Sequence, residues 1–243
     1  MKKLASIAIA LVAALGAFAQ PEAGTFSITP KVGLSTANLS GYGKNLRLSV
    51  QSSDGTKYSQ ATEATTYFVG GLVAGAEVNY QMSKHFALSA GLLYSQQGSE
   101  RMGDLNVTGA AFRDEDQMKL AYLNVPILAN FYVVKGLALK VGIQPGFLLS
   151  AKENIRETAS GGVASADRHE KVDAKSSCKT FDFAIPVGIS YEFKNIVLDA
   201  RYNIGMADVF KSKIPSDGTS GLVGSQSNKN QVLQITLGYK FNL

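Results

Sequence analysis

The chain has 243 residues, 45% of them hydrophobic, with a formal net charge of +5 at pH 7, one cysteine and no tryptophan. A charge this small does not predict nucleic-acid binding, and one cysteine excludes an internal disulfide. After the N-terminus, no run reaches the roughly 18 consecutive apolar residues of a transmembrane helix. The length suits a single large all-β domain.

The N-terminus has the layout of a secretory signal peptide. A charged start precedes the apolar run Leu4–Leu15, and Ala17–Ala19 supplies small residues where a signal peptidase reads. The apolar run is shorter than the roughly 20 residues that a spanning helix needs. We therefore expect a signal peptide over 1–19 and a mature domain over 20–243.

The mature chain contains eight segments in which apolar residues alternate with small or polar ones. Successive side chains point to opposite faces of a strand, so each segment is predicted to be a β-strand. In chain order the predicted strands are Phe26–Ser35, Tyr67–Tyr80, Phe86–Gln97, Met118–Val133, Leu137–Ser150, Phe181–Phe193, Ile196–Met206 and Asn230–Leu243. Four of them contain a proline, which cannot donate to the ladder, so bulges or breaks are expected at Pro30, Pro126, Pro145 and Pro186.

The connections between these strands alternate strictly between long and short. The links after the second, fourth and sixth strands are tight turns, whereas four long polar stretches are predicted to be loops: Thr36–Thr66, Gly98–Gln117, Ala151–Thr180 and Ala207–Lys229. An up-and-down meander with all its long loops at one end produces this rhythm, and closing it removes both edges. The predicted fold is an all-β, eight-stranded antiparallel up-and-down barrel.

The distribution of residues between the two faces indicates which face meets lipid. Each strand reaches the ~9–11 residues that cross a membrane when tilted. Glycine, which is needed where side chains crowd inside a narrow barrel, falls on the charged face at nine positions and clearly on the apolar face only at Gly70. The nine are Gly33, Gly71, Gly75, Gly91, Gly142, Gly146, Gly188, Gly205 and Gly238. Aromatic residues recur near the strand ends on the apolar face, as in the girdles of membrane barrels. These features favour a transmembrane barrel over the alternative, a soluble ligand-binding barrel.

The inward face of such a barrel carries charges of both signs. The four predicted cations are Lys31, Lys140, Arg201 and Lys240, and the four predicted anions are Glu77, Asp182, Glu192 and Asp199. Because buried charges must be paired, we expect a salt-bridged network that fills the lumen. A small barrel with a filled interior conducts poorly, so little or no pore is predicted.

Several stretches resemble the outer-membrane β-barrel family of Bacteroidota that is often called PorT-like. They are AYLNVPILANFYV (121–133), VGIQPGFLLSAK (141–152), FDFAIPVGISYEF (181–193), VLDARYNIGMADVF (197–210) and QITLGYKF (234–241). The resemblance implies an eight-stranded barrel in the outer membrane with periplasmic termini. Many such barrels end in an aromatic residue, whereas this chain ends in Leu243, so Tyr239, Phe241 and Leu243 are the expected assembly signal, with Phe241 in the usual terminal role.

The leading functional hypothesis is a structural or surface-interaction protein that acts through the four long loops, because loops on a rigid scaffold commonly carry binding. The expected partners are outer-membrane lipid, lipopolysaccharide and the barrel-assembly machinery. The chain is expected to be a monomer, and its extracellular ligand is unassigned. Lys44, Arg47 and Lys57 are candidates for lipopolysaccharide phosphates, with an ordinary solvated surface as the favoured alternative.

Two other functions are weighed against this one. A lipid-modifying or protease-like enzyme needs a base, and only His85 and His169 are available, in no recognisable motif, so the protein is predicted not to be an enzyme. A narrow channel for small solutes is disfavoured, because the equal numbers of predicted cations and anions in the lumen are expected to pair and fill it. No cofactor or metal motif is present, and Cys178 is interpreted as a tolerated loop cysteine rather than a reactive thiol.

Overall fold

The computed structural model describes residues 22–41, 46–51, 57–62, 65–107, 110–160, 166–211 and 228–243. The predicted signal peptide, Lys44 and most of the fourth predicted loop lie outside these ranges. Within the described ranges, no helix has the length and apolar character needed to cross a membrane.

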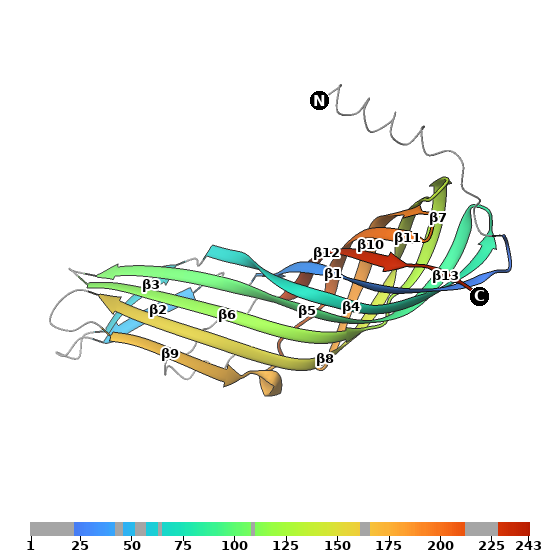
Figure 1. Ribbon diagram of the computed structural model, residues 1–243. Coiled ribbons are helices and arrows are strands. Elements are labelled where there is room, and N and C mark those ends of the chain that lie inside the picture. The colour runs from blue at the N-terminus through green and yellow to red at the C-terminus, as the bar shows by residue number, and fades with distance from the viewer. Residues whose placement is uncertain are drawn as a thin grey trace, which may run out of the picture.

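Thirteen strands and one short 3₁₀ helix make up the described chain (Figure 1). They are β1 (Phe26–Ser40), β2 (Leu46–Gln51), β3 (Lys57–Thr62), β4 (Thr65–Ser83), β5 (Phe86–Val107), β6 (Ala110–Asn124), β7 (Ile127–Val134), β8 (Leu137–Ser160), β9 (Ala166–Asp173), η1 (Lys175–Ser177), β10 (Phe181–Phe193), β11 (Ile196–Asp208), β12 (Lys229–Tyr239) and β13 (Phe241–Asn242). All the strand pairings are antiparallel.

Eleven of these strands form one sheet that closes on itself. The first strand, β1, pairs with β4 on one side and with β12 on the other, and β8 pairs with β10 to complete the ring. Two ring positions are shared by consecutive strands, β6 with β7 and β12 with β13, while β9 pairs only with β8. The ring therefore has eight strand positions, which confirms the predicted up-and-down barrel.

The strand predicted over Met118–Val133 is interrupted at Pro126, as expected for a residue without a backbone donor. It forms β6 and β7, which both pair with β5 and β8. The neighbouring strands bridge the break, because Gly91 N donates to Pro126 O at 2.9 Å and Val125 N donates to Pro145 O at 2.8 Å. The expected breaks are wrong at the other three positions, because Pro30, Pro145 and Pro186 lie inside continuous strands.

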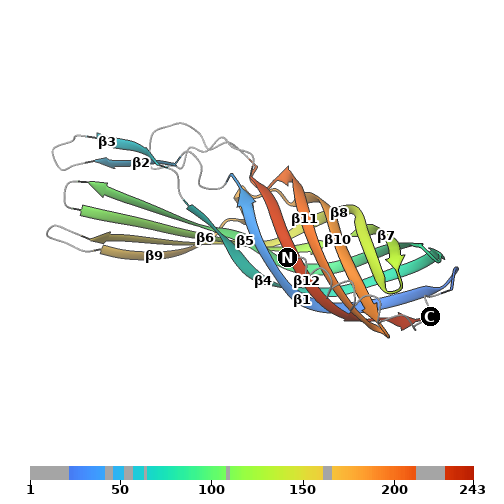
Figure 2. The same cartoon turned by 90° about the horizontal axis from the view of Figure 1, so that it is seen from above.

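The prediction of long loops is wrong for much of three of the four stretches. The β5–β6 ladder continues to Val107↔Ala110, β8 runs to Ser160 and pairs with β9, and β2 and β3 form a separate two-stranded sheet. Figure 2 shows these hairpins projecting together from one end of the barrel. Polar residues occupy even buried positions of these hairpins, since Arg101 of β5 and Asp116 of β6 are both buried and form an ion pair at 2.7 Å. The hairpins therefore lack the apolar–polar alternation by which the barrel strands were predicted.

The two ends of the barrel therefore differ. The turn end has three tight turns, at Lys84–His85, Lys135–Gly136 and Lys194–Asn195. The other end, from which the hairpins project, is called the hairpin end below. Two parts of the fourth predicted loop are described, 207–211 and 228–229. The first completes β11 and forms an isolated bridge between Phe210 and Cys178, and the second begins β12 at Lys229.

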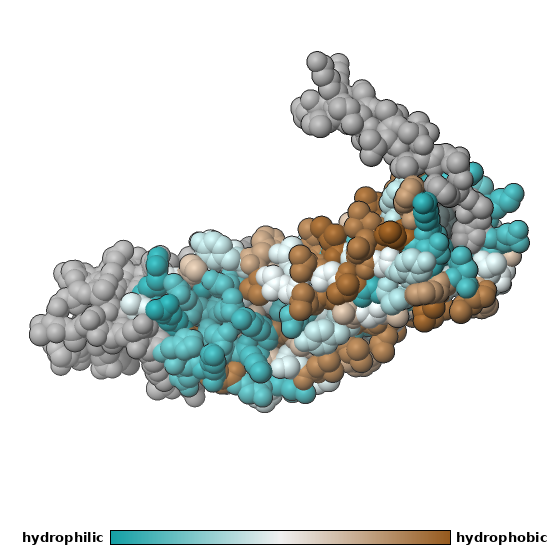
Figure 3. All heavy atoms as spheres, viewed as in Figure 1, coloured by the Kyte–Doolittle hydropathy of each residue, from teal (hydrophilic) through white to brown (hydrophobic). Residues whose placement is uncertain are grey.

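The outer surface of the barrel is an apolar band, which gives way to a hydrophilic surface over the hairpins (Figure 3). The height of this band can be followed along β8, where the outward-facing apolar residues extend from Leu139 to Leu149 and have side chains that are about half exposed. Eleven tilted residues match the hydrocarbon thickness of a bilayer, which needs roughly 9–11. Aromatic pairs border the band, Phe86–Phe131 near the turn end and Phe147–Phe181 towards the hairpin end, with ring centroids 5.1 Å and 5.9 Å apart.

Glycine on the inward face has a steric cause. A Cβ added to Gly33 would lie 2.0 Å from Ile235 O, and one added to Gly142 would lie 2.0 Å from Ile127 O. Both contacts are with the backbone of the neighbouring strand. A Cβ on outward-facing Gly70, in contrast, would have no atom within 4 Å. The predicted segregation of glycine thus follows from crowding on the concave face.

Candidate functional site in the lumen

Five charged side chains from four strands converge inside the barrel. Lys31 lies on β1, Glu77 on β4, Lys140 on β8, and Asp199 and Arg201 lie two residues apart on β11. All five are buried, and the fully buried Arg201 side chain is among the largest in the protein. Alternate residues of each strand point inward. The barrel strands themselves therefore bring these five side chains together, without any contribution from a loop.

Each carboxylate of this cluster contacts more than one cation. Glu77 accepts from Arg201 Nη2 at 2.8 Å and from Lys31 Nζ at 2.7 Å. Asp199 Oδ2 accepts from Arg201 Nη2 at 3.1 Å and from Lys140 Nζ, and Lys31 Nζ lies 3.6 Å from it. Such multiple pairing offsets the desolvation of buried charges, which is several kcal/mol for each ion.

The other three predicted charges do not join this cluster. Lys240 donates to Glu192 Oε2 at 2.8 Å, forming a separate pair near the turn end. Asp182 lies apart, on β10, where its Oδ2 accepts from Asn230 Nδ2 at 2.9 Å. The eight predicted charges thus form a five-residue cluster with three cations and two carboxylates, one separate ion pair and one hydrogen-bonded aspartate. Arg101 and Asp116 form a further buried ion pair, at 2.7 Å, that was not predicted.

A small polar cavity lies on the turn-end side of the cluster. Its volume is about 40 Å³, and its lining includes Asn79, Asn130, Lys140, Glu192 and Lys240. A water molecule needs roughly 10–15 Å³, so the cavity has room for only a few waters. Polar side chains next to it bond to one another, as Asn130 Nδ2 does to Ser89 Oγ at 3.0 Å.

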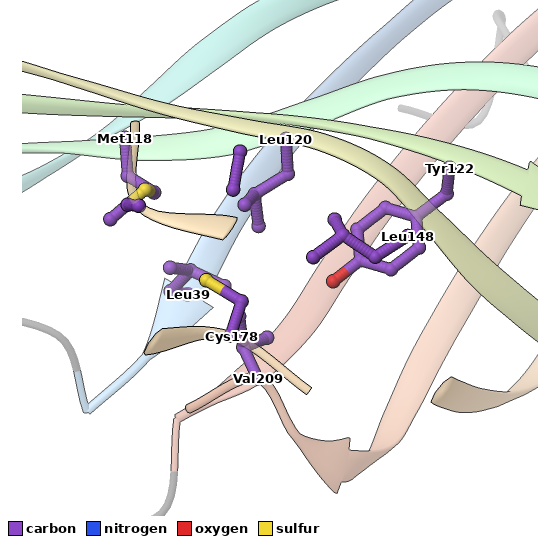
Figure 4. Close-up of a cluster of buried hydrophobic side chains, with 9 residues drawn as sticks. Leu39, Met118, Leu120, Tyr122, Leu148, Cys178 and Val209 are labelled. Atoms are coloured by element: carbon purple, nitrogen blue, oxygen red, sulfur yellow. The ribbon is translucent and has the colours of Figure 1, made fainter. Parts of the chain in front are cut away.

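Towards the hairpin end lies a cluster of buried hydrophobic side chains (Figure 4). The apolar cap, as we call this cluster, consists of Leu39, Met118, Leu120, Tyr122, Leu148, Ala151, Ala174, Cys178 and Val209, with Phe210 packed against it. The cap is not predicted from the sequence, because several of its members lie in stretches predicted to be loops.

The segment after β9 is held between β8 and the end of β11, and it contributes Ala174 and Cys178 to the apolar cap. Backbone bonds hold it, from Leu148 N to Thr180 O at 2.7 Å, from Lys179 N to Val209 O at 2.7 Å and from Lys211 N to Ser177 O at 3.0 Å. The segment places Cys178 in full burial, which corrects its interpretation as a cysteine of a polar loop. Burial raises the pKa of the Cys178 thiol to about 11, so the thiolate form is disfavoured.

The two histidines considered for catalysis lie at opposite ends of the barrel. His85 is exposed in the turn between β4 and β5, and His169 is exposed on β9, opposite Arg156 of β8. No single site contains both. Among the described residues, no group of three or more His, Cys, Asp or Glu side chains is placed to hold a metal ion.

The predicted assembly signal lies on the outer face at the turn end. Tyr239 ends β12, Phe241 begins β13, and their rings are 4.8 Å apart. Leu243 N donates to Phe26 O at 2.9 Å, which joins the C-terminus to the start of β1. All three side chains of the predicted signal are exposed.

A closed antiparallel barrel with a lipid-height apolar band and a charged interior defines a transmembrane β-barrel. The chain belongs to the outer membrane protein beta-barrel domain family, whose model matches residues 18–211. The protein is accordingly located in the outer membrane.

Solved structures of outer-membrane proteins are similar to this chain. The attachment invasion locus protein Ail of Yersinia pestis is 14% identical, with 90% of this chain and 99% of that chain covered and a TM-score of 0.33. OprG of Pseudomonas aeruginosa is 17% identical, with coverages of 90% and 97% and a TM-score of 0.34. The protease OmpT of Escherichia coli is 10% identical, with coverages of 93% and 99% and a TM-score of 0.32. The comparison with curated proteins gave no match.

Proposed function

We propose that this protein is a non-conducting, non-enzymatic outer-membrane barrel that binds partners through its hairpins at the cell surface. The observation that carries the proposal is the continuation of β5, β6 and β8 well beyond the apolar band. Above Leu149, β8 continues for eleven residues to Ser160, and β9 pairs with that extension. A hydrogen-bonded extension of this length has a defined backbone geometry, which suits a binding surface on a rigid scaffold.

The filled lumen supports a non-conducting barrel. The Arg201–Glu77 contact lies inside the barrel, and the apolar cap lies beyond it towards the hairpin end. A solute would have to separate buried ion pairs and displace a packed segment held by backbone bonds. A narrow barrel whose interior is filled in this way is a poor channel.

We also propose an orientation of the barrel in the outer membrane and the partners that it meets there. The hairpin end faces the exterior, and the turn end with both termini faces the periplasm, where Tyr239, Phe241 and Leu243 present the signal for the barrel-assembly machinery. The protein is a monomer among outer-membrane lipid and lipopolysaccharide. PorT-like membership belongs to the proposal as well, supported by the patterns at 121–133 and 181–193.

The test removes the β5–β6 and β8–β9 hairpins and keeps the eight strand positions of the barrel. Glu100 lies opposite Gln117, and Asn154 lies opposite Lys171. Replacing 101–116 and 155–170 each with Asn-Gly therefore closes both ladders with two-residue turns that suit antiparallel strands. A heat-shifted band on a gel verifies that the shortened barrel folds.

The full-length and shortened proteins are then compared in a strain that lacks the gene, with adhesion to polysaccharide-coated surfaces and detergent resistance as readouts. We expect the shortened barrel to fold and to fail in complementation, and we expect full-length protein in planar bilayers to show no large steady conductance. Complete complementation by the shortened barrel would refute the surface role of the β5–β6 and β8–β9 hairpins, and a large steady conductance would refute the closed lumen.

A further inference from the structure

Two lysines lie directly opposite each other on the outer face of the barrel, at its hairpin end. The β6–β8 register pairs Lys119 with Lys152, and both side chains are exposed. Their sequence neighbours Leu120 and Ala151 point inward into the apolar cap. The lysines must therefore point outward, because side chains alternate along a strand.

The lysine pair is placed at the height of the lipid headgroups. Leu149 is the last apolar residue of the band on β8, and Lys152 follows three residues later. Three residues of a strand tilted by about 40° rise roughly 7–8 Å. The headgroup region on each side of the hydrocarbon is about 5–8 Å thick, so both ammonium groups lie where lipid phosphates lie.

The surroundings of this pair are predominantly basic. Lys171 and Lys175 are exposed nearby, and the acidic neighbour is Asp173, which faces Lys152 from β9. Asp173 Oδ1 accepts from Lys175 N at 2.9 Å. Two residue pairs further along the β5–β6 ladder, a second acidic residue, Glu100, accepts from Gln117 Nε2 at 2.8 Å. Among the residues that the structure describes, neither Lys119 nor Lys152 has an ion-pair partner.

Like charges directly opposite each other in an antiparallel pair destabilise the ladder, because the Cβ atoms are only about 4.5–5.5 Å apart. An anion between the two ammonium groups would reverse the sign of this interaction. We propose that Lys119 and Lys152 form a binding site for the phosphate groups of lipopolysaccharide in the outer leaflet. The site uses the orientation proposed above but does not depend on what the hairpins bind.

Lipid A that carries both phosphates serves as the probe, and dephosphorylated lipid A and inorganic phosphate serve as comparisons. The thermal transition of the folded protein in a zwitterionic detergent is followed by the heat-shifted gel band during titration with each probe. We expect lipid A to raise the transition temperature, and the other two probes to leave it unchanged at the same phosphate concentration.

The test variant is Lys119→Gln with Lys152→Gln. It should fold, and without lipid its transition should be equal to or above that of the wild type, because the repulsion is gone. Its half-saturating lipid A concentration should rise on the order of 30-fold, as expected for the loss of two cations at an anionic surface. The matched control, Lys84→Gln with Lys135→Gln, changes two exposed lysines at the turn end and should respond like the wild type. Lys119→Arg with Lys152→Arg should retain the response.

Three results would overturn the proposal. The first is an unchanged lipid A response in the Lys119→Gln, Lys152→Gln protein, which would make these lysines ordinary solvated residues. The second is an equal loss in the turn-end control. The third is full stabilisation by inorganic phosphate alone, which would assign the site to a free anion. The hairpin-shortened barrel retains Lys119, Lys152 and Lys171, so it should still bind lipid A whether or not the surface role fails.

Discussion

Arg201 on β11 donates from Nη2 to Glu77 Oε1 on β4 at 2.8 Å, although the two residues lie 124 positions apart in the chain. Glu77 also contacts Lys31, and Lys140 Nζ is 3.9 Å from its Oε2. The Glu77 carboxylate thus lies within 4 Å of three cationic groups inside the barrel and offsets part of their charge. Closure of the sheet is what brings β1, β4, β8 and β11 around a common interior.

Replacing Glu77 with Gln should therefore destabilise the barrel strongly. The substitution preserves size but leaves Lys31, Lys140 and Arg201 with Asp199 as the remaining carboxylate of the cluster. Breaking a buried charge pair by removing one partner typically costs about 3–5 kcal/mol. Since the chain has no tryptophan, unfolding by guanidinium in lipid vesicles is followed by the heat-shifted gel band or by circular dichroism.

Glu192→Gln is the control for this prediction. Glu192 is part of an ion pair with Lys240, but its side chain is 21% exposed, so water can replace more of the lost interaction. We expect a loss of about 1 kcal/mol. Equal unfolding midpoints for Glu77→Gln and the wild type would contradict the view that the cluster supports the closed lumen.

Gly33→Ala tests the crowding of the concave face. Its new Cβ would lie 2.0 Å from Ile235 O and 2.6 Å from Thr236 Cα, both backbone atoms of β12. Overpacking that displaces backbone costs about 1–3 kcal/mol, so a lower free energy of unfolding or failed assembly is expected. Gly70→Ala adds the same methyl group where no atom lies within 4 Å and should be neutral. Similar effects of the two substitutions would refute the assignment of the faces.

Leu39→Ala tests the apolar cap. Leu39 is 1% exposed and packs in the cluster that contains Cys178 and Val209. Truncating a buried leucine leaves a cavity and typically costs about 2–5 kcal/mol. The lipid-facing control Leu34→Ala, whose side chain is 66% exposed, should cost less. Guanidinium unfolding of both variants decides the prediction, and a smaller loss for Leu39→Ala than for Leu34→Ala would contradict it.

Thiol labelling reports on the same cap through Cys178. Because burial raises the pKa of its thiol to about 11, the thiol keeps its proton through pH 8 and lacks solvent access. Iodoacetamide should label the folded protein slowly at pH 8 and the unfolded chain rapidly. Ser176→Cys in a Cys178→Ser background, at a nearby exposed position, should label rapidly when folded. Equally fast labelling of Cys178 in the folded wild type would show that the cap is open.

Local alternation was sufficient to predict the barrel strands and their faces. In a membrane barrel every strand has one face towards lipid and one towards the lumen, so its own residues carry the pattern that Leu139, Val141 and Ile143 show on β8. The placement of Gly33 on the inward face and Gly70 on the outward face could be predicted for the same reason. Glycine indicates local crowding, and it falls on the face where the neighbouring backbone is close.

Features that depend on several strands at once were decided only by the tertiary structure. The register between neighbouring strands around the ring places Glu77 beside Arg201 and Asp182 beside Asn230. The sequence of a single strand does not determine this register. The hairpins were not predicted because polar residues such as Arg101 and Asp116 occupy buried positions there, so the sequence lacks an apolar–polar period of two. The apolar cap joins Leu39, Met118 and Cys178 from distant segments, so its burial exists only after the barrel closes.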